Sequence, residues 1–214
     1  MHLARREGDS RGMDSFPAFF PLRGGRVVVA GHGAMADAKA RLFEGSPATV
    51  ERIAGDAAMD RRSYEGARLA FVAGDDREFR RAASAAARAA HVPVNVVDDA
   101  DLCDFHTPAL IDRGSVVVAV GTAGASPLLA AVLRDALEAH TPRRIGVLAA
   151  LLGRHRGEIR QVFPDLDRRS AFLRTMIEGP VGKAALGGDA DLAAARLEAA
   201  LAEVHQGRGG ARSP

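Results

Sequence analysis

Several residue types that cross-link or anchor proteins are scarce in this chain of 214 residues. Cys103 is the only cysteine, which excludes an internal disulfide framework and a thiolate metal cluster. No run of about 18 apolar residues exists that could cross a bilayer. The first 14 residues are charged and lack the apolar centre of a signal peptide. These features predict a cytoplasmic protein without a membrane partner.

An excess of charge of one sign is also lacking. The chain has 29 basic and 27 acidic side chains, which give a formal net charge of +2 at pH 7. This balance produces no overall field that attracts nucleic acid, so no nucleic-acid partner is expected. The length and the hydrophobic share of 47% are sufficient for one substantial core or two smaller ones.

The stretch 27–42, VVVAGHGAMADAKARL, predicts a strand, a glycine turn and a helix in direct succession. Its three valines form a β-branched run that is typical of a parallel strand buried on both faces. Gly31 and Gly33 then let phosphates approach the backbone where the helix exposes its first N–H groups. The pattern Gly31-x-Gly33-x-x-Ala36 is that of a dinucleotide-binding turn, although an ordinary tight turn can show it as well.

A dinucleotide site also needs an acidic residue near the end of the second strand, where a carboxylate can bind the ribose hydroxyls. Glu51 lies in the short strand-like run 48–53, about 20 residues past the glycines. Its neighbour Arg52 would instead suit a 2′-phosphate, and a solvated edge charge is a third interpretation of Glu51. The pattern favours NAD and leaves NADP open.

Further strand-like runs lie at 69–73 and 93–97, and a hairpin pattern lies at 110–112 and 115–120. Gly74 and Asp75 follow the first of these runs, where a glycine again lets a ligand approach and an aspartate can cap the helix expected over 77–91. Four apolar strand runs, two of them joined by helices, predict a doubly wound α/β domain with a parallel sheet.

From Gly121 onward the pattern changes to small residues and helices. The loop 121–127 leads into a helix with Ser126 as its expected N-cap. Such a loop offers N–H donors and two hydroxyls to an anion, and a well-capped helix without a ligand explains it equally well. Beyond Pro142 only helical stripes of apolar residues appear.

Four segments in this order resemble the siroheme synthase family: FPAFFPLRGGRVVVAGHGAMADAKARL, FVAGDD, VPVNVVDD and FHTPALIDRGSVVVAVGTAGASPLLAAVLRDALE. The resemblance implies an NAD-binding Rossmann domain, a dimerisation segment and a small helical domain in a homodimer. The expected boundaries are a disordered tail 1–14, the Rossmann domain 15–112, the dimerisation segment 113–141, the helical domain 142–206 and a disordered tail 207–214.

The activity that the resemblance implies is that of a precorrin-2 dehydrogenase, an oxidoreductase that forms sirohydrochlorin with NAD as hydride acceptor. Some members of the family are also ferrochelatases, lyases that insert ferrous iron to give siroheme. The alternative is a divergent homologue that binds tetrapyrrole without oxidising it, or that acts only as a metal chelatase.

The resemblance also implies the roles of individual residues. From the residues alone, Asp98 is a turn former at a strand end, whereas the resemblance makes it the catalytic general base. The expected cofactor-binding residues are Gly31, Gly33, Ala34, Met35, Glu51, Ile53, Ala54, Gly74 and Asp75. The expected substrate-binding residues are His106, Arg113, Thr122, Gly124 and Ser126. Cys103 and His106 form no recognised set of metal ligands, so no metal site is expected.

Some positions differ from those of the family. His32 replaces a glycine of the phosphate turn, and the connection 54–68 is shorter than usual. Arg80 stands where relatives have asparagine, and Ala109 stands where serine is usual. Each change falls in the expected cofactor pocket or the expected substrate-binding cleft, so the alternative of a non-dehydrogenase homologue stays open.

Overall fold

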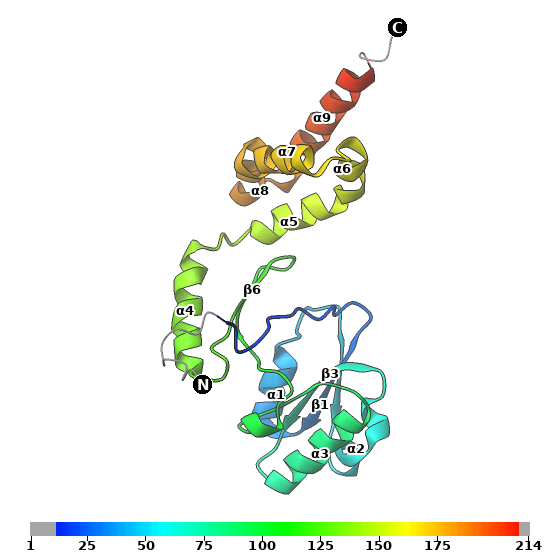
Figure 1. Ribbon diagram of the computed structural model, residues 1–214, viewed down its shortest axis with the longest axis vertical. Coiled ribbons are helices and arrows are strands. Elements are labelled where there is room, and N and C mark those ends of the chain that lie inside the picture. The colour runs from blue at the N-terminus through cyan, green and yellow to red at the C-terminus, as the bar shows by residue number, and fades with distance from the viewer. Residues whose placement is uncertain (1–11, 210–214) are drawn as a thin grey trace, which may run out of the picture. The chain divides into compact units, whose positions relative to one another are not determined.

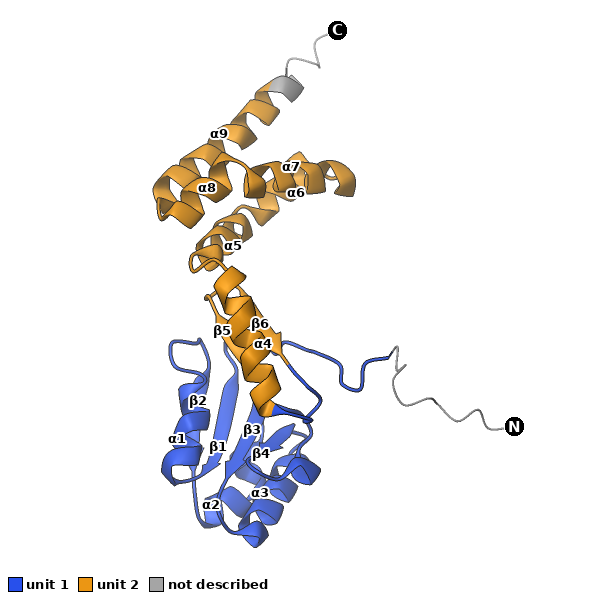
Figure 2. Ribbon diagram, turned by 90° about the vertical axis from the view of Figure 1, so that its left-hand side faces the viewer, with its two compact units in different colours: residues 1–107, 121–126 blue, residues 108–120, 127–214 orange. Residues whose placement is uncertain are grey.

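The computed structural model describes residues 12–209, so the expected disordered tails lie mostly outside the described residues. The chain divides into two compact units, coloured separately in Figure 2. The first unit contains the residues up to Thr107 together with 121–126, and the second contains 108–120 and the residues from Pro127 onward.

The first unit is built on a parallel sheet of four strands. The strands are β1 (Arg26–Gly31), β2 (Thr49–Ile53), β3 (Ala67–Ala73) and β4 (Val94–Val96). Their order in the sheet is β2-β1-β3-β4 (Figure 2), with β1 and β3 side by side at its centre (Figure 1). The chain passes from β1 outward to β2 and returns to the other side of β1 for β3. The strand order therefore reverses between β1 and β3, which is where open α/β sheets bind ligands.

Helices cover both faces of this sheet because successive strand residues alternate between two cores. Val28, Ala30 and Val72 face α2 (Asp56–Met59), the 3-10 turn η1 (Arg61–Tyr64) and α3 (Arg77–Ala89). Val27, Val29 and Phe71 face the side of α1 (Gly33–Arg41). Figure 2 shows α1 on one side of the strands and α2 and α3 on the other. The doubly wound α/β fold predicted from the sequence is confirmed.

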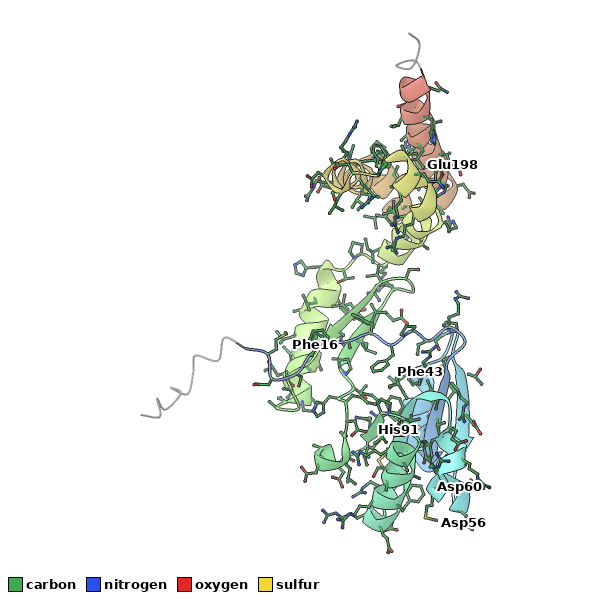
Figure 3. The ribbon with its side chains drawn as sticks, turned by 45° about the vertical axis from the view of Figure 1, so that its right-hand side comes forward. Phe16, Phe43, Asp56, Asp60, His91 and Glu198 are labelled. Carbon is green, nitrogen blue, oxygen red and sulfur yellow. The ribbon has the colours of Figure 1, made fainter. Side chains whose placement is uncertain are left out.

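The short connection between β2 and β3 has regular structure that the sequence pattern did not predict. It contains α2 and η1, marked by Asp56 and Asp60 in Figure 3. The Asp60 side chain caps η1 by accepting a hydrogen bond from the Arg62 N–H, and the fully buried Tyr64 donates to the carbonyl of Ala58 at 2.7 Å. Ala58 and Tyr64 are thus part of the core on the α3 side of the sheet.

The second unit begins with the expected antiparallel hairpin, β5 (Ala109–Asp112) and β6 (Val117–Val120), and the expected helix α4 (Pro127–His140). The remaining helices are α5 (Ile145–Arg154), α6 (Arg156–Val162), α7 (Leu166–Glu178), α8 (Pro180–Gly187) and α9 (Ala190–Gly209). They share a core around Leu151, Val181 and Leu197. A Cβ built on Gly146 of α5 would lie 1.6 Å from the carbonyl oxygen of Arg113, so the helix and the hairpin turn are in backbone contact. None of the described helices combines the length and the apolar character needed to span a membrane.

Candidate functional site

Three loops that carry predicted site residues follow neighbouring strands of the parallel sheet. Gly31 at the end of β1 pairs with Ala73 at the end of β3, and Val72 of β3 pairs with Val96 of β4. Since parallel strands all end at the same edge, the loops after β1, β3 and β4 gather there. The structure therefore brings the glycine turn, the loop 74–76 and Asp98 to one edge of the first unit.

The two glycines of the first loop serve different purposes. Gly31 has φ +115°, and a Cβ on it would lie 1.7 Å from the Ala73 carbonyl oxygen, so only glycine fits between β1 and β3. Gly33 has φ +79°, and a Cβ on it would meet nothing within 4 Å. The first glycine allows close strand packing, and the second leaves open space in front of α1.

The start of α1 fits a diphosphate group. In the part of the chain that the structure describes, the His32 side chain makes no capping hydrogen bond, and the first turn of α1 has no acidic residue. The first N–H groups of the helix are thus available to an anion. The His32 residue is extended (φ −143°, ψ 173°) and exposed, Ala34 is exposed, and Met35 packs against the core on the α1 side.

Glu51 already has a partner. It lies opposite Val28 in the middle of β2, two residues before the strand ends, and its carboxylate pairs with the guanidinium of Arg26. Arg26 also donates to the carbonyls of Ser63 at 2.9 Å and Glu65 at 2.6 Å. A ribose bound by Glu51 would have to compete with this ion pair.

The end of β2 offers other groups. Ile53 closes the strand, and Ala54 beyond it is exposed. Arg52, the residue that would suit a 2′-phosphate, forms an ion pair with Asp37 of α1 at 2.6 Å. Both charged candidates for selecting between NAD and NADP are therefore engaged with side chains of the same unit.

Asp98 lies in a tight turn directly after β4. Its φ of +57° is in the left-handed region, which aspartate tolerates better than most residues, and it is exposed. The Cys103 thiol supports this turn: its sulfur accepts from the Val96 N–H at 3.2 Å and lies 3.3 Å from the Asp99 carbonyl oxygen. Burial raises the pKa of the Cys103 thiol, so the neutral form that donates to a carbonyl is favoured.

A polar network that the sequence pattern did not predict lies on the α1 side of β4. Lys39 of α1 donates to the Thr107 hydroxyl at 3.3 Å, and this hydroxyl donates to the Asn95 side chain at 3.4 Å. Asn95, which is buried, donates to the Phe105 carbonyl at 2.9 Å. Burial lowers the pKa of Lys39, and the nearby Cys103 and Asp98 act in the opposite direction.

Four of the five predicted substrate-binding residues belong to the first unit: His106, Thr122, Gly124 and Ser126. A Cβ on Gly124 would lie 3.6 Å from the His106 ring, so the ring lies against the loop 121–126. The Thr122 hydroxyl accepts from the Ser126 N–H and donates to the Ser126 carbonyl, both at 3.1 Å. The loop is thus closed by its own hydroxyl group.

Arg113, the fifth, belongs to the second unit and is already paired. Its guanidinium donates to Glu138 of α4 at 2.8 Å, and this hydrogen bond lowers the pKa of the Glu138 carboxyl. A hollow of about 420 Å³ lies beside it, lined by Arg113 and residues 138–143. Among the described residues, no three side chains of His, Cys, Asp or Glu gather to form a metal site.

Comparison with protein families gives two matches. Residues 18–109 match a family described as "Putative NAD(P)-binding", and residues 144–201 match the "Sirohaem synthase dimerisation region". The second match covers the region expected as the helical domain, and the segment 113–141 precedes it.

Curated relatives and a solved structure agree with these matches. The chain is 38% identical to a siroheme synthase of Pseudomonas putida over 91% of its length and 40% identical to one of Methylococcus capsulatus over 92%. It spans about half the length of these relatives, 46% and 45%. Its fold is similar to that of SirC, a precorrin-2 dehydrogenase, with a TM-score of 0.62, 19% identity and coverage of 76% of this chain and 89% of that one.

Proposed function

Because the chain belongs to the siroheme synthase family, we propose that it oxidises precorrin-2 to sirohydrochlorin with NAD as the hydride acceptor. The observation that carries the proposal is the common sheet edge, where the open turn at Gly33 and the carboxylate of Asp98 follow strands of one sheet. When bound, NAD supplies the group that accepts the hydride.

The proposed cofactor site uses the backbone more than side chains. The N–H groups of Gly33, Ala34 and Met35 at the start of α1 hold the diphosphate, with Gly31 behind them against β3. The remaining proposed contacts are Ile53 and Ala54 beside the adenosine and Gly74 and Asp75 on the loop after β3. The absence of an acidic residue from the first turn of α1, within the described residues, supports this assignment because a carboxylate there would repel phosphates.

Asp98 is the proposed general base. Loss of a hydride from a carbon of the macrocycle must be matched by loss of a proton, and the Asp98 carboxylate would accept that proton. The products are then sirohydrochlorin, NADH and one proton. The exposure of Asp98 meets one requirement of this role, because a substrate can reach the carboxylate.

His106 and the loop 121–126 are the proposed substrate-facing elements of the first unit. A Cβ on Gly124 would lie at van der Waals distance from the imidazole, so the His106 ring and this loop are neighbours that one substrate could contact together. Arg113 would have to exchange Glu138 for a substrate carboxylate in order to bind it. We therefore rank Arg113 below His106 as a substrate contact.

The proposed assembly is a homodimer in which a second copy covers α4. Leu128, Val132 and Leu137 of this helix are 75%, 56% and 46% exposed. Leu129 and Leu133, which are 50% and 45% exposed, extend the apolar surface around the helix between these positions. Several large apolar side chains exposed on one helix are a common mark of a protein interface. The name of the family that matches residues 144–201 supports a homodimer, and a role in its interface for 113–141, the segment that contains α4, is part of the proposal.

The test is a coupled assay of the purified protein with precorrin-2 and NAD. We expect NADH and the absorption spectrum of sirohydrochlorin to appear in equal amounts. Asp98→Asn should suppress both products while leaving NADH binding intact, because the cofactor contacts lie on other loops. Asp101→Asn, an exposed carboxylate in the same connection, is the matched control and should retain activity.

Two outcomes would contradict the proposal. If the wild-type protein fails to bind NADH but binds sirohydrochlorin or inserts ferrous iron, the chain is the non-dehydrogenase homologue. His32 in the phosphate turn is the specific feature that favours this second candidate. If Asp98→Asn is fully active, Asp98 is a turn former and another group accepts the proton.

A further inference from the structure

Arg80 of α3 connects two of the three loops at the proposed site. Its Nη1 donates to the carbonyls of Gly74 at 2.8 Å and Asp75 at 3.1 Å, so it holds the loop after β3. Its Nε lies 3.9 Å from Oδ2 of Asp99, the residue next to Asp98. One guanidinium thus contacts the proposed cofactor loop on one side and the turn that carries the proposed base on the other.

The ion pair of Arg80 and Asp99 is largely shielded from solvent. The side chains of Arg80 and Asp99 are only 16% and 13% exposed, so water and salt screen their attraction weakly. The Nε of Arg80 is also buried and has no hydrogen-bond partner among the described residues. The Asp99 carboxylate, 3.9 Å away, is the ion-pair partner of this nitrogen, so a buried donor without a hydrogen bond depends on the position of Asp99.

The geometry of Asp98 explains why such a contact is useful. A residue at φ +57° can return to a more common conformation by rotating the adjoining peptides. An anchored Asp99 carboxylate fixes the peptide that follows Asp98. The Cys103 sulfur, in contact with Val96 and Asp99, supports the turn from its other side.

We propose that Arg80 is a positioning residue for the dehydrogenation, which holds the Asp98 turn at a fixed distance from the Gly74–Asp75 loop. This inference rests on the proposed function. It adds a residue that takes no part in the transfer of the proton or the hydride. Arginine is suited to the task because its planar fork can contact the two carbonyls and the carboxylate at once.

The test compares Arg80→Gln, Asp99→Asn and the double variant with Arg81→Gln, an exposed arginine on the same turn of α3. We expect Arg80→Gln and Asp99→Asn each to lower kcat by about tenfold. The double variant should be no slower than Arg80→Gln, because both changes remove the same contact. For Asp99→Asn the KM for NAD should change by less than about twofold, because the carbonyl contacts of Arg80 remain. Arg80→Lys should restore part of kcat because it keeps the charge.

Amide hydrogen exchange gives a readout that does not depend on activity. Exchange of the amides in 74–76 and 97–99 should become faster by about tenfold in Arg80→Gln and stay unchanged in Arg81→Gln. Unchanged exchange in Arg80→Gln, or additive losses of kcat in the double variant, would overturn the positioning role. A wild-type protein that never forms NADH would instead overturn the proposed function itself, and with it any role of Arg80 in that reaction.

Discussion

The backbone of Gly31 lies so close to Ala73 that a Cβ built on the glycine would be 1.7 Å from the Ala73 carbonyl oxygen. Neither partner can move away, because both residues are paired within the sheet. Gly31→Ala should therefore separate β1 from β3 and cost more than about 4 kcal/mol, or prevent folding. Urea unfolding of the variant measures this loss, and a stability within about 1 kcal/mol of the wild type would contradict it.

Gly33→Ala is the matched comparison two residues later. The new Cβ meets nothing within 4 Å, so the cost is that of a left-handed alanine, about 1 to 2 kcal/mol. The methyl group would occupy the open space at the start of α1, and we expect NADH affinity to fall by about tenfold. Binding measured by NADH fluorescence on the folded variant checks this, and unchanged affinity would move the diphosphate away from this turn.

Glu51→Gln tests whether the Arg26 ion pair or a ribose occupies this carboxylate. Because the side chains of Arg26 and Glu51 are 26% and 45% exposed, the pair should contribute no more than about 1 kcal/mol. We expect NADH affinity to change by less than about twofold, since the carboxylate lies in mid-strand and is engaged. Glu65→Gln, which breaks the exposed pair with Arg61, is the control for loss of a surface charge. A tenfold loss of affinity confined to Glu51→Gln would establish the ribose contact.

Tyr64→Phe removes a buried hydrogen bond and an ionisable group together. Loss of the donor to the Ala58 carbonyl should cost about 1 to 2 kcal/mol at neutral pH. Burial also raises the pKa of the Tyr64 phenol above its ordinary value, so above about pH 10 the unfolded chain releases this proton while the folded chain retains it. Wild-type stability therefore falls as the pH rises through that range, and the advantage over Tyr64→Phe should shrink. Urea midpoints at about pH 8 and about pH 11 test this, and an equal difference at both would contradict it.

The apolar surface of α4 predicts that charges placed there will separate the dimer. Leu128→Asp with Val132→Asp should give a monomer in light scattering, because two buried carboxylates would lose their solvation in the interface. Ala85→Asp, at an exposed position of α3, adds a charge elsewhere and should leave the dimer intact. A doubly substituted protein that is still dimeric would place the interface on another surface.

The sheet could be predicted because each strand is marked by a run of neighbouring apolar residues in the sequence. Val27, Val28 and Val29 are fully buried, as a β-branched run between two helical layers should be. The glycine turn could be placed for the same reason, since strand, turn and helix are contiguous in sequence. Asp98 could be placed at the same edge because it directly follows the last strand.

Contacts between distant segments could not be predicted. The spacing of Glu51 from the glycines is that of a ribose-binding residue, but the strand continues to Ile53, and the register puts Arg26 within reach of the carboxylate. The links from Lys39 to Thr107 and from Arg80 to Asp99 join residues 68 and 19 positions apart, and only the packing of the helices brings them together. A sequence pattern predicts which face of a helix or strand is apolar. It does not predict which polar side chains of two packed elements come into contact.

Gly146 at the start of α5 determines how closely the hairpin turn and the helical bundle can pack. With a would-be Cβ of Gly146 only 1.6 Å from the Arg113 carbonyl, the hairpin turn and the first helix of the bundle are in direct backbone contact. Arg113 also forms an ion pair with Glu138, so the same residue of the hairpin contacts both α4 and α5. Any residue larger than glycine at position 146 would push the hairpin turn away from the bundle, so this junction of the second unit tolerates no side chain.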